Sequence, residues 1–163
     1  MTMLTRDAIW QALEDVPDPE IPMVSLVEMG IVRDVEIGDK TVTVTITPTF
    51  SGCPALQVMK DEIVERLKKE EGISDVTVET TYSPPWTTDW IAETARDKLK
   101  DFGITPPPRL DGTAVEIVLF EPVACPQCGS TNTSIKNNWG PTPCKTIHYC
   151  NSCNQPFESF KPL

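Results

Sequence analysis

Four cysteines near the C-terminal end restrict the fold of this chain more than any other feature of its sequence. They form the pairs CPQC and CNSC, so that Cys125 and Cys128 are followed, after 21 intervening residues, by Cys150 and Cys153. Two residues between cysteines let both sulfur atoms of a tight turn point at one centre, and two such turns complete a tetrahedron of thiolates. The spacing therefore predicts a zinc ribbon with a structural metal ion.

Zinc is one of three interpretations of these cysteines. An iron centre of the rubredoxin type uses the same ligands, and two disulfides would account for the same pairs in a secreted protein. The opening sequence MTMLTRDAIWQALED has no basic region followed by an apolar run, and no stretch approaches the roughly 20 apolar residues of a membrane span. We therefore expect a soluble cytoplasmic protein, and a reducing compartment favours metal over disulfides.

The region after Pro122 is also too small to fold on hydrophobic burial alone. Its large apolar side chains are few, chiefly Ile135, Trp139, Ile147, Phe157 and Phe160. Modules of about 40 residues usually need additional stabilisation, such as a bound metal ion, in order to fold. We expect that metal binding drives the folding of this module.

Cys144 and His148 lie beside the four cysteines in the sequence PTPCKTIHYC. Cys144 is interpreted as an extra metal ligand, as a resolving thiol, or as a small buried side chain near the metal. It lacks the two-residue spacing of the other pairs, which favours the buried side chain. His148 is expected at the surface or in packing.

The charge of the chain excludes two classes of partner. The formal net charge is −10 and the pI is near 4.5, which argues against a surface that neutralises phosphates or binds anionic lipid. Residues 111–163 contain three lysines, no arginine and four acidic residues, so the ribbon lacks the excess of positive charge that binds nucleic acid. We expect the ribbon to contact another protein, and we expect neither nucleic acid nor a membrane as a partner of the chain.

A proline-rich segment separates two parts of different composition. Residues 1–110 carry 20 acidic and 11 basic side chains, whereas five of the six cysteines lie in residues 111–163. The segment ITPPPRLDG, residues 104–112, contains three consecutive prolines, which enforce an extended backbone and stop a helix. We predict an α/β domain over residues 1–110 and a zinc-ribbon module over residues 111–163.

Three helices are predicted in the first part. Apolar residues recur at helical spacing over residues 5–16, with Thr5 as N-cap, and again over residues 54–70. A third helix follows the sequence SPPWTTDW and stops at Gly103. Trp86 and Trp90 flank its start, and they pack either in the core or on a partner surface.

Strand patterns alternate with these helices. Val and Thr alternate within residues 30–49, which predicts a hairpin with a two-residue turn at Gly38 and Asp39. The sequence SDVTVET, residues 74–80, predicts a further strand. The order helix, strand, strand, helix, strand, helix indicates an α+β fold, a small mixed sheet with helices packed on it.

Cys53, in TFSGCPALQVM, lies between a predicted strand and a predicted helix. If Pro54 is the first helical residue, Cys53 is the N-cap, and the positive end of the helix dipole lowers the pKa of its thiol. The alternative is turn chemistry, in which the cysteine behaves as a small buried apolar side chain. The one histidine of the chain lies in the ribbon, which disfavours a Cys–His hydrolase.

Three blocks of sequence together resemble the MIP18 family, also called DUF59. They are DPEIPMVSLVEMGIVRDVEI, VTVTITPTFSGCPALQVMKDEI and SPPWTTDWIAETARDKLKDFGITPP, which cover most of residues 17–108. With the ribbon that follows, the whole chain is similar to the PaaD (PaaJ) subunits of phenylacetyl-CoA epoxidase systems. Because the MIP18 family is associated with iron–sulfur cluster assembly, the resemblance implies an accessory protein and not the oxygenase itself.

The resemblance implies an iron or iron–sulfur maturation role in aerobic phenylacetate degradation. The implied partners are the di-iron oxygenase and its flavin and iron–sulfur reductase, and a homodimer is left open. The sequence has no paired Glu-x-x-His motifs, no Gly-rich dinucleotide fingerprint and no P-loop. We therefore expect the oxygen chemistry to take place in another protein.

The resemblance also assigns site residues. The family's cysteine maps onto Cys53, and its Asp-Pro-Glu loop maps onto Asp18 and Glu20. The implied role of Cys53 is a transient thiolate ligand to iron or an iron–sulfur cluster. Because one thiolate leaves a cluster underligated, the cluster could also be shared between two chains that each contribute a Cys53. Asp18 and Glu20 are implied as supporting carboxylates, and Thr49 and Ser51 as hydrogen-bonding partners of the sulfur or as helix caps.

Two other functions stay open at this point. The first is an architectural adaptor subunit that delivers no metal and depends on the ribbon. The second is a thiol-dependent enzyme that uses Cys53 as its nucleophile.

Overall fold

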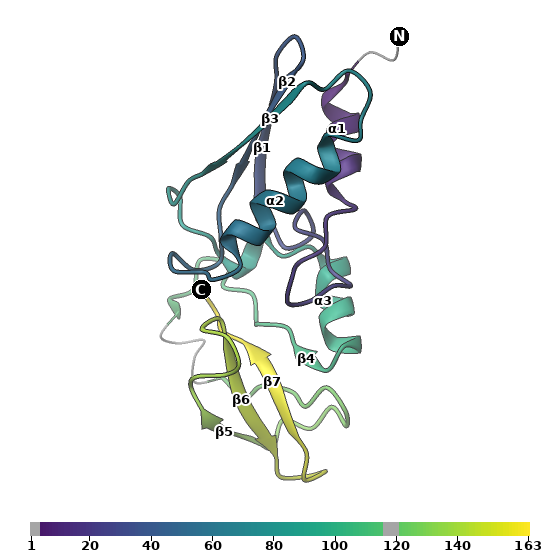
Figure 1. Cartoon of the computed structure of the whole chain (residues 1–163). Helices are drawn as coiled ribbons and strands as arrows, with labels where there is room; N and C mark the ends of the chain where they lie inside the picture. Colours follow the sequence, from purple (N-terminus) through teal and green to yellow (C-terminus); the bar gives the residue numbers. More distant parts are fainter. Residues whose placement is uncertain (1–3, 116–120) are drawn as a thin grey trace. The chain divides into compact units, whose positions relative to one another are not determined.

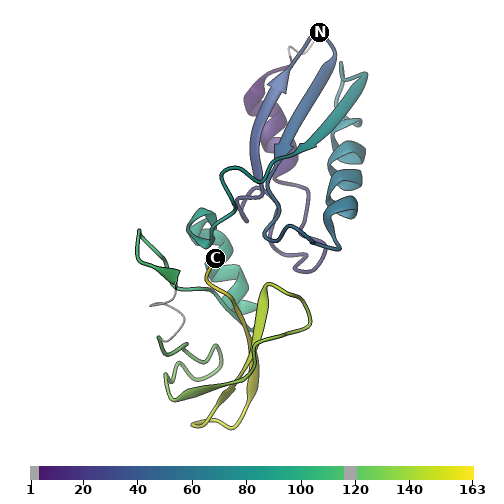
Figure 2. The ribbon, with the colours of Figure 1, turned by 90° about the vertical axis from the view of Figure 1, so that its left-hand side faces the viewer.

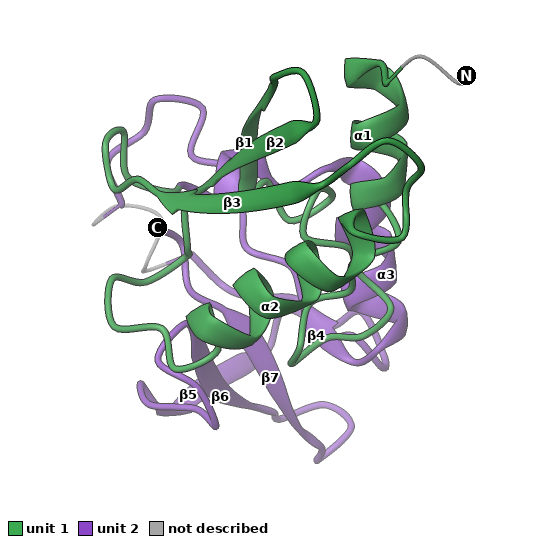
Figure 3. Cartoon of the chain, turned by 45° about the horizontal axis from the view of Figure 1, so that its top comes forward, with its two compact units in different colours: residues 1–86 green, residues 87–163 purple. Residues whose placement is uncertain are grey.

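The computed structural model describes residues 4–115 and 121–163, which fall into two compact units divided between Trp86 and Thr87 (Figure 3). The first unit contains a three-stranded sheet and the second a four-stranded sheet. Within the described ranges, no helix has both the length and the apolar character that a bilayer span requires.

The first unit follows the predicted order of helices and strands (Figure 1). Its elements are α1 (Arg6–Leu13), β1 (Val32–Ile37), β2 (Thr41–Ile46), α2 (Leu56–Leu67) and β3 (Asp75–Thr80). The central strand β2 pairs antiparallel with β1 and parallel with β3, and Figure 2 shows the three strands side by side. The predicted α+β fold with a small mixed sheet is confirmed.

Local sequence signals account for the start of α1 and for the hairpin. The Thr5 hydroxyl accepts a hydrogen bond of 3.2 Å from the backbone amide three residues later, which confirms Thr5 as the N-cap. The hairpin turn lies one residue later than predicted. The Gly38 amide donates to the Thr41 carbonyl at 2.8 Å, so the two central residues are Asp39 and Lys40.

An apolar layer holds the first unit together. α1 contacts β1 and α2, and α2 contacts β3, so both helices pack on the sheet and on each other. The alternation of β2 buries Val42, Val44 and Ile46, while the threonines between them are more exposed. Trp86 is also buried, and its indole N–H donates to the Met29 carbonyl at 3.0 Å. Trp86 is therefore part of the core.

Three loops of the first unit meet at one end of its sheet. The strand register places the first residue of β1 beside the last residue of β2, and the last residue of β2 beside the last residue of β3. The loops before β1 (17–31), after β2 (47–55) and after β3 (81–86) therefore share this end. We call these three loops and the first turn of α2 the cysteine end, because Cys53 lies there.

The second unit joins a short helix to a four-stranded sheet. Its elements are η1 (Thr88–Trp90), α3 (Glu93–Asp101), β4 (Ile104–Thr105), β5 (Thr133–Asn137), β6 (Lys145–Cys150) and β7 (Pro156–Phe160). The strand order is β4-β7-β6-β5, in which β5, β6 and β7 form an antiparallel ribbon and β4 adds to β7 in parallel. The predicted stop of the third helix at Gly103 is confirmed by its φ of 86°.

The sequence pattern does not predict β4, which lies in the proline-rich segment. Because β4 pairs with β7 and contacts α3, residues 87–110 group with the ribbon in the second compact unit. The compact units divide at residues 86 and 87, and the domain boundary at residues 110 and 111 stays a prediction.

We predict that Trp86→Phe destabilises the metal-loaded protein by about 1 to 3 kcal/mol, because the buried Met29 carbonyl loses its indole donor. Urea unfolding followed by circular dichroism measures this change. Trp139→Phe is the control, since that side chain is 68% exposed and its replacement should change stability by less than about 0.5 kcal/mol. Equal stability of the two variants would contradict the prediction.

Candidate functional site

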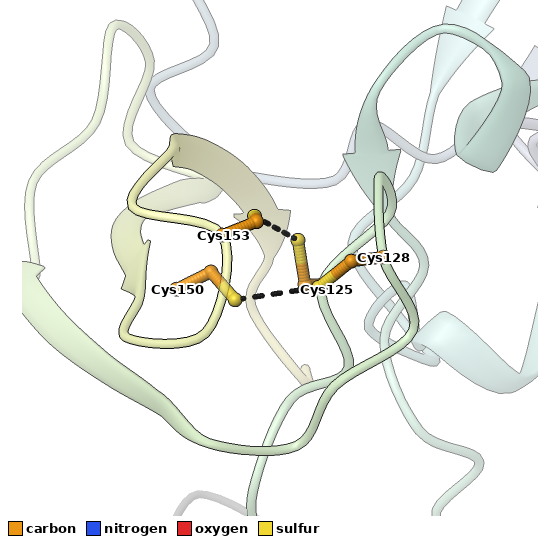
Figure 4. A group of neighbouring side chains, drawn as sticks. All are labelled: Cys125, Cys128, Cys150 and Cys153. Carbon is orange, nitrogen blue, oxygen red and sulfur yellow. Dashed lines mark hydrogen bonds between the residues drawn. The ribbon is translucent and has the colours of Figure 1, made fainter.

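The second unit brings the sulfur atoms of the four ribbon cysteines together. Cys125 and Cys128 lie in the turn before β5, Cys150 ends β6, and Cys153 lies in the turn before β7. The four sulfur atoms all lie within 4.8 Å of one another, at 3.7 Å for Cys125–Cys153 and 3.5 Å for Cys128–Cys150 (Figure 4). A tetrahedral zinc ion with bonds of about 2.3 Å requires sulfurs about 3.8 Å apart. The predicted ligands therefore fit one metal ion.

Each cysteine pair lies in its own backbone turn, and the two turns are of the same kind. The Gly129 amide donates to the Cys125 carbonyl, and the Asn154 amide donates to the Cys150 carbonyl, each at 2.9 Å. Both donors have positive φ, 73° for Gly129 and 58° for Asn154, a region that glycine and asparagine tolerate. Gly129 thus closes the turn of the first pair, and Asn154 is its equivalent in the second pair.

The four thiols need a cation in order to ionise together. The Cys153 backbone amide, with that of Ser152, lowers the pKa of the Cys150 thiol to about 6. Burial and the neighbouring thiols raise the pKa of Cys153 to about 12. A bound metal ion supplies the positive charge that lets four thiolates share this space, and soft sulfur donors favour zinc or iron over hard cations. The donor set therefore fits the predicted metal.

Cys144 and His148 do not belong to this cluster of described residues. Cys144 is buried, and its sulfur lies 3.2 Å from the Thr142 hydroxyl oxygen. His148 is buried too, and its ring stacks on that of Phe157 with centroids 5.4 Å apart. Burial lowers the pKa of His148. These positions agree with a packing role for both side chains.

Cys53 lies in the loop between β2 and α2. It is not the N-cap of α2, because the helix begins at Leu56 and its N-cap is Ala55. The prediction that Pro54 opens the helix is wrong. Pro54 and Ala55 instead form a turn, in which the Leu56 amide donates to the Cys53 carbonyl at 3.2 Å.

The thiol of Cys53 is half-buried, and burial raises its pKa above the ordinary value. The backbone amides of Ala55 and Leu56 donate to the sulfur and oppose this shift, whereas the carboxylates of Glu20 and Asp18 raise the pKa further. The predicted lowering of the pKa is therefore wrong. Amides do stabilise the thiolate, but desolvation and negative charge outweigh them.

The Asp-Pro-Glu loop lies close to Cys53 at the cysteine end. The Asp18 side chain accepts hydrogen bonds from the amides of Glu20 at 2.8 Å and Ile21 at 3.0 Å, which is the way an aspartate organises a turn. Asp18 and Glu20 are near enough to Cys53 to change its pKa. The fold thus brings together the three residues that the resemblance groups.

Other polar side chains at this end have less predictable positions. Thr49 is half-buried and Ser51 is exposed, and the capping interpretation of both is wrong because no side chain caps α2. The hydroxyl of Thr47, which is 1% exposed, has no hydrogen-bond partner among the described residues. Beyond this end, in the second turn of α2, one carboxylate oxygen of Glu62 is also buried without a hydrogen-bond partner among the described residues, and burial and the charge of Asp18 raise the pKa of Glu62. The sequence pattern does not reveal these last two groups.

Comparison with known proteins identifies two family segments. The iron–sulfur cluster assembly protein family matches residues 6–80, and the PaaD zinc beta ribbon domain matches residues 117–161. The chain is 38% identical to the D subunit of the "Putative 1,2-phenylacetyl-CoA epoxidase" of Escherichia coli (strain K12), over 94% of this chain and 90% of that protein. The chain belongs to the PaaD family.

Two further relatives match a little over half of this PaaD chain. A Porphyromonas gingivalis protein named "Fe-S protein maturation auxiliary factor" is 34% identical over 56% of this chain and 87% of its own length. The crystal structure of a DUF59 domain from Bacillus anthracis has a TM-score of 0.54 and 26% identity, and covers 57% of this chain and 89% of that one. The predicted combination of a MIP18 (DUF59) unit with a PaaD zinc ribbon is confirmed.

We predict that the PaaD ribbon binds one metal ion per chain and that Cys128→Ser lowers this content at least about fivefold, because three thiolates do not close a tetrahedral site. Elemental analysis, with cobalt(II) substitution to detect thiolate-to-metal charge transfer, measures the loss. Cys144→Ser is the matched control and should retain the metal. Retention of the metal by Cys128→Ser, or its loss from Cys144→Ser, would contradict the four-cysteine assignment.

We also predict that Asp18→Asn and Glu20→Gln each lower the pKa of Cys53, because fewer negative charges oppose the thiolate. The alkylation of Cys53 by iodoacetamide near neutral pH, followed by mass spectrometry of the metal-loaded protein, should accelerate about two- to tenfold. Asp39→Asn, in the hairpin turn at the opposite end of the sheet, should leave the rate unchanged. Slower alkylation in both site variants would show that the carboxylates act in another way.

Proposed function

We propose that this protein is an accessory factor that takes up iron or an iron–sulfur cluster at Cys53 and passes it to a metalloprotein of the phenylacetyl-CoA epoxidase. The recipient is the di-iron oxygenase or its reductase. The metal at Cys53 is cargo, whereas the metal of the ribbon is structural zinc. One observation carries the proposal: Cys53 lies with Asp18 and Glu20 in a unit that matches iron–sulfur cluster assembly proteins.

The number of protein ligands at Cys53 suits transfer better than storage. Cys53 is the one cysteine in residues 1–86. Iron–sulfur clusters are normally held by four thiolates, so a site with one thiolate and nearby carboxylates leaves coordination positions for another molecule. The ligands of a recipient protein can fill those positions and then replace Cys53. A second copy of this chain, donating its own Cys53, is the dimeric version of the same proposal.

The charges around Cys53 favour a cation over nucleophilic catalysis. Burial and the two carboxylates raise the pKa of the thiol, so little thiolate is present at neutral pH in the metal-free protein. A cation reverses this balance, because it interacts favourably with the carboxylates and the sulfur and releases the thiol proton. Residues 1–86 contain no histidine that would serve as a base for a cysteine nucleophile. These features support metal cargo over a thiol-dependent enzyme.

The ribbon supports an architectural adaptor as the second candidate function. Ile135 and Trp139 on this module are 51% and 68% exposed, and the Lys161 ammonium lies 4.6 Å from the centre of the Trp139 ring. An adaptor would use such a surface to hold epoxidase components together. Under this function the sulfur of Cys53 would be dispensable.

Complementation of a strain that lacks this protein distinguishes the candidates. We expect Cys53→Ser to lower phenylacetyl-CoA epoxidation at least about tenfold and to lower the iron content of the purified oxygenase or reductase in the same proportion. Cys144→Ser, which removes a buried cysteine outside the metal cluster, should restore both to wild-type levels.

Each alternative predicts a different pattern. Full activity and full iron content with Cys53→Ser would overturn metal delivery, and loss of activity in Cys128→Ser alone would then favour the adaptor. Normal iron content with lost activity in Cys53→Ser would favour the thiol-dependent enzyme.

A further inference from the structure

The exposed apolar side chains of the first unit are concentrated at the cysteine end. Eight large hydrophobic side chains are exposed in the described ranges, and four of them belong to this unit: Met23, Phe50, Val58 and Tyr82, which are 44% to 48% exposed. One lies in each of the three loops, and Val58 lies in the first turn of α2. Isolated exposed apolar residues are common, but their restriction to one end of the unit needs an explanation.

The loop after β2 places Phe50 beside Cys53. The Cys53 amide donates to the Phe50 carbonyl at 3.1 Å, so both residues belong to one turn. A Cβ atom added at Gly52 would lie 3.0 Å from the Phe50 ring, which shows that the ring folds back along the loop toward Gly52. Phe50 thus lies in the same turn as Cys53, with its ring against Gly52.

Backbone hydrogen bonds fix the other two loops at the same end. The Asp18 amide donates to the Val24 carbonyl at 2.8 Å, which places Met23 in the loop that brings Asp18 near Cys53. In the third loop, the Thr81 amide donates to the last carbonyl of β2 at 2.9 Å, directly before Tyr82. The exposed side chains are therefore carried by ordered segments.

The charge of the cysteine end has one sign. The loops 17–31, 47–55 and 81–86 contain Asp18, Glu20 and Glu28 and no lysine or arginine. Residues 1–86 as a whole carry 16 acidic and 7 basic side chains. An apolar surface surrounded by negative charges is complementary to an apolar surface surrounded by positive charges.

We propose that the cysteine end is a docking surface for a partner polypeptide that presents apolar side chains flanked by lysine or arginine. Phe50 and Tyr82 are its aromatic anchors, since aromatic side chains supply much of the affinity in protein interfaces. A second copy of this chain fits less well, because a twofold contact would bring Asp18, Glu20 and Glu28 against their own copies. The identity of the partner as another subunit of the epoxidase rests on the proposed function.

Binding measurements with the full-length, zinc-loaded protein test this surface. The probes are the purified oxygenase and the purified reductase of the epoxidase system. We expect at least one of them to bind, the double variant Phe50→Ser, Tyr82→Ser to bind at least about tenfold more weakly, and added salt to weaken wild-type binding. The matched control is Ile135→Ser, Trp139→Ser, which removes two apolar side chains from the second unit that are even more exposed, and it should retain wild-type affinity.

Two further variants make the outcome specific. Benzoylphenylalanine in place of Tyr82 should cross-link to a partner segment that contains lysine or arginine beside apolar residues, whereas the same photoreactive residue in place of Thr41 at the opposite end should not. Docking is measured without added iron, so that a failure of metal delivery and a failure of docking give different results. Binding to neither probe, equal affinity of the Phe50 and Tyr82 variant, loss of binding in the ribbon control, or cross-linking to a second copy would each overturn the proposal.

Discussion

The parallel pairing of β2 with β3 is the interaction on which the rest of the first unit depends. Parallel neighbours cannot be joined by a tight turn, so the chain must leave the end of β2, cross the sheet as α2 and return to start β3. The crossover brings the loops after both strands to one end, and the antiparallel pairing of β1 adds the Asp-Pro-Glu loop to them. The position of Cys53 next to two carboxylates is a consequence of this topology.

The two units place cysteine in opposite chemical situations. In the ribbon, four thiols can supply the complete ligand set of a tetrahedral ion, which closes the site to further ligands, and a metal there would reinforce the small buried cluster around Phe157. At Cys53 a single thiol is half-buried beside negative charge, and both the burial and the charge raise its pKa. Cysteine thus has a structural role in the second unit, whereas in our proposal the cysteine of the first unit binds a metal that is passed on.

The sequence predicts those features that local patterns determine. Alternating Val and Thr identify β2, two Cys-x-x-Cys pairs identify the ribbon, and Thr5 identifies the start of α1. The errors at Cys53 arise because its environment is three-dimensional: Pro54 is compatible with a helix start but forms a turn, and the pKa of the thiol depends on burial and on a loop some 30 residues away. The two-residue strand β4 is found only through its partner β7, since the sequence around it indicates nothing more than an extended backbone.

The central claim is that iron binds at the cysteine end through the sulfur of Cys53, with oxygen ligands from the residues around it. X-ray absorption at the iron edge tests this most directly, using zinc-loaded protein that has been reduced and given ferrous iron alone. We expect one sulfur neighbour and several oxygen neighbours in the wild-type spectrum, and the loss of the sulfur neighbour in Cys53→Ser. Identical iron spectra from the two proteins, or no retained iron in the wild type, would contradict the claim.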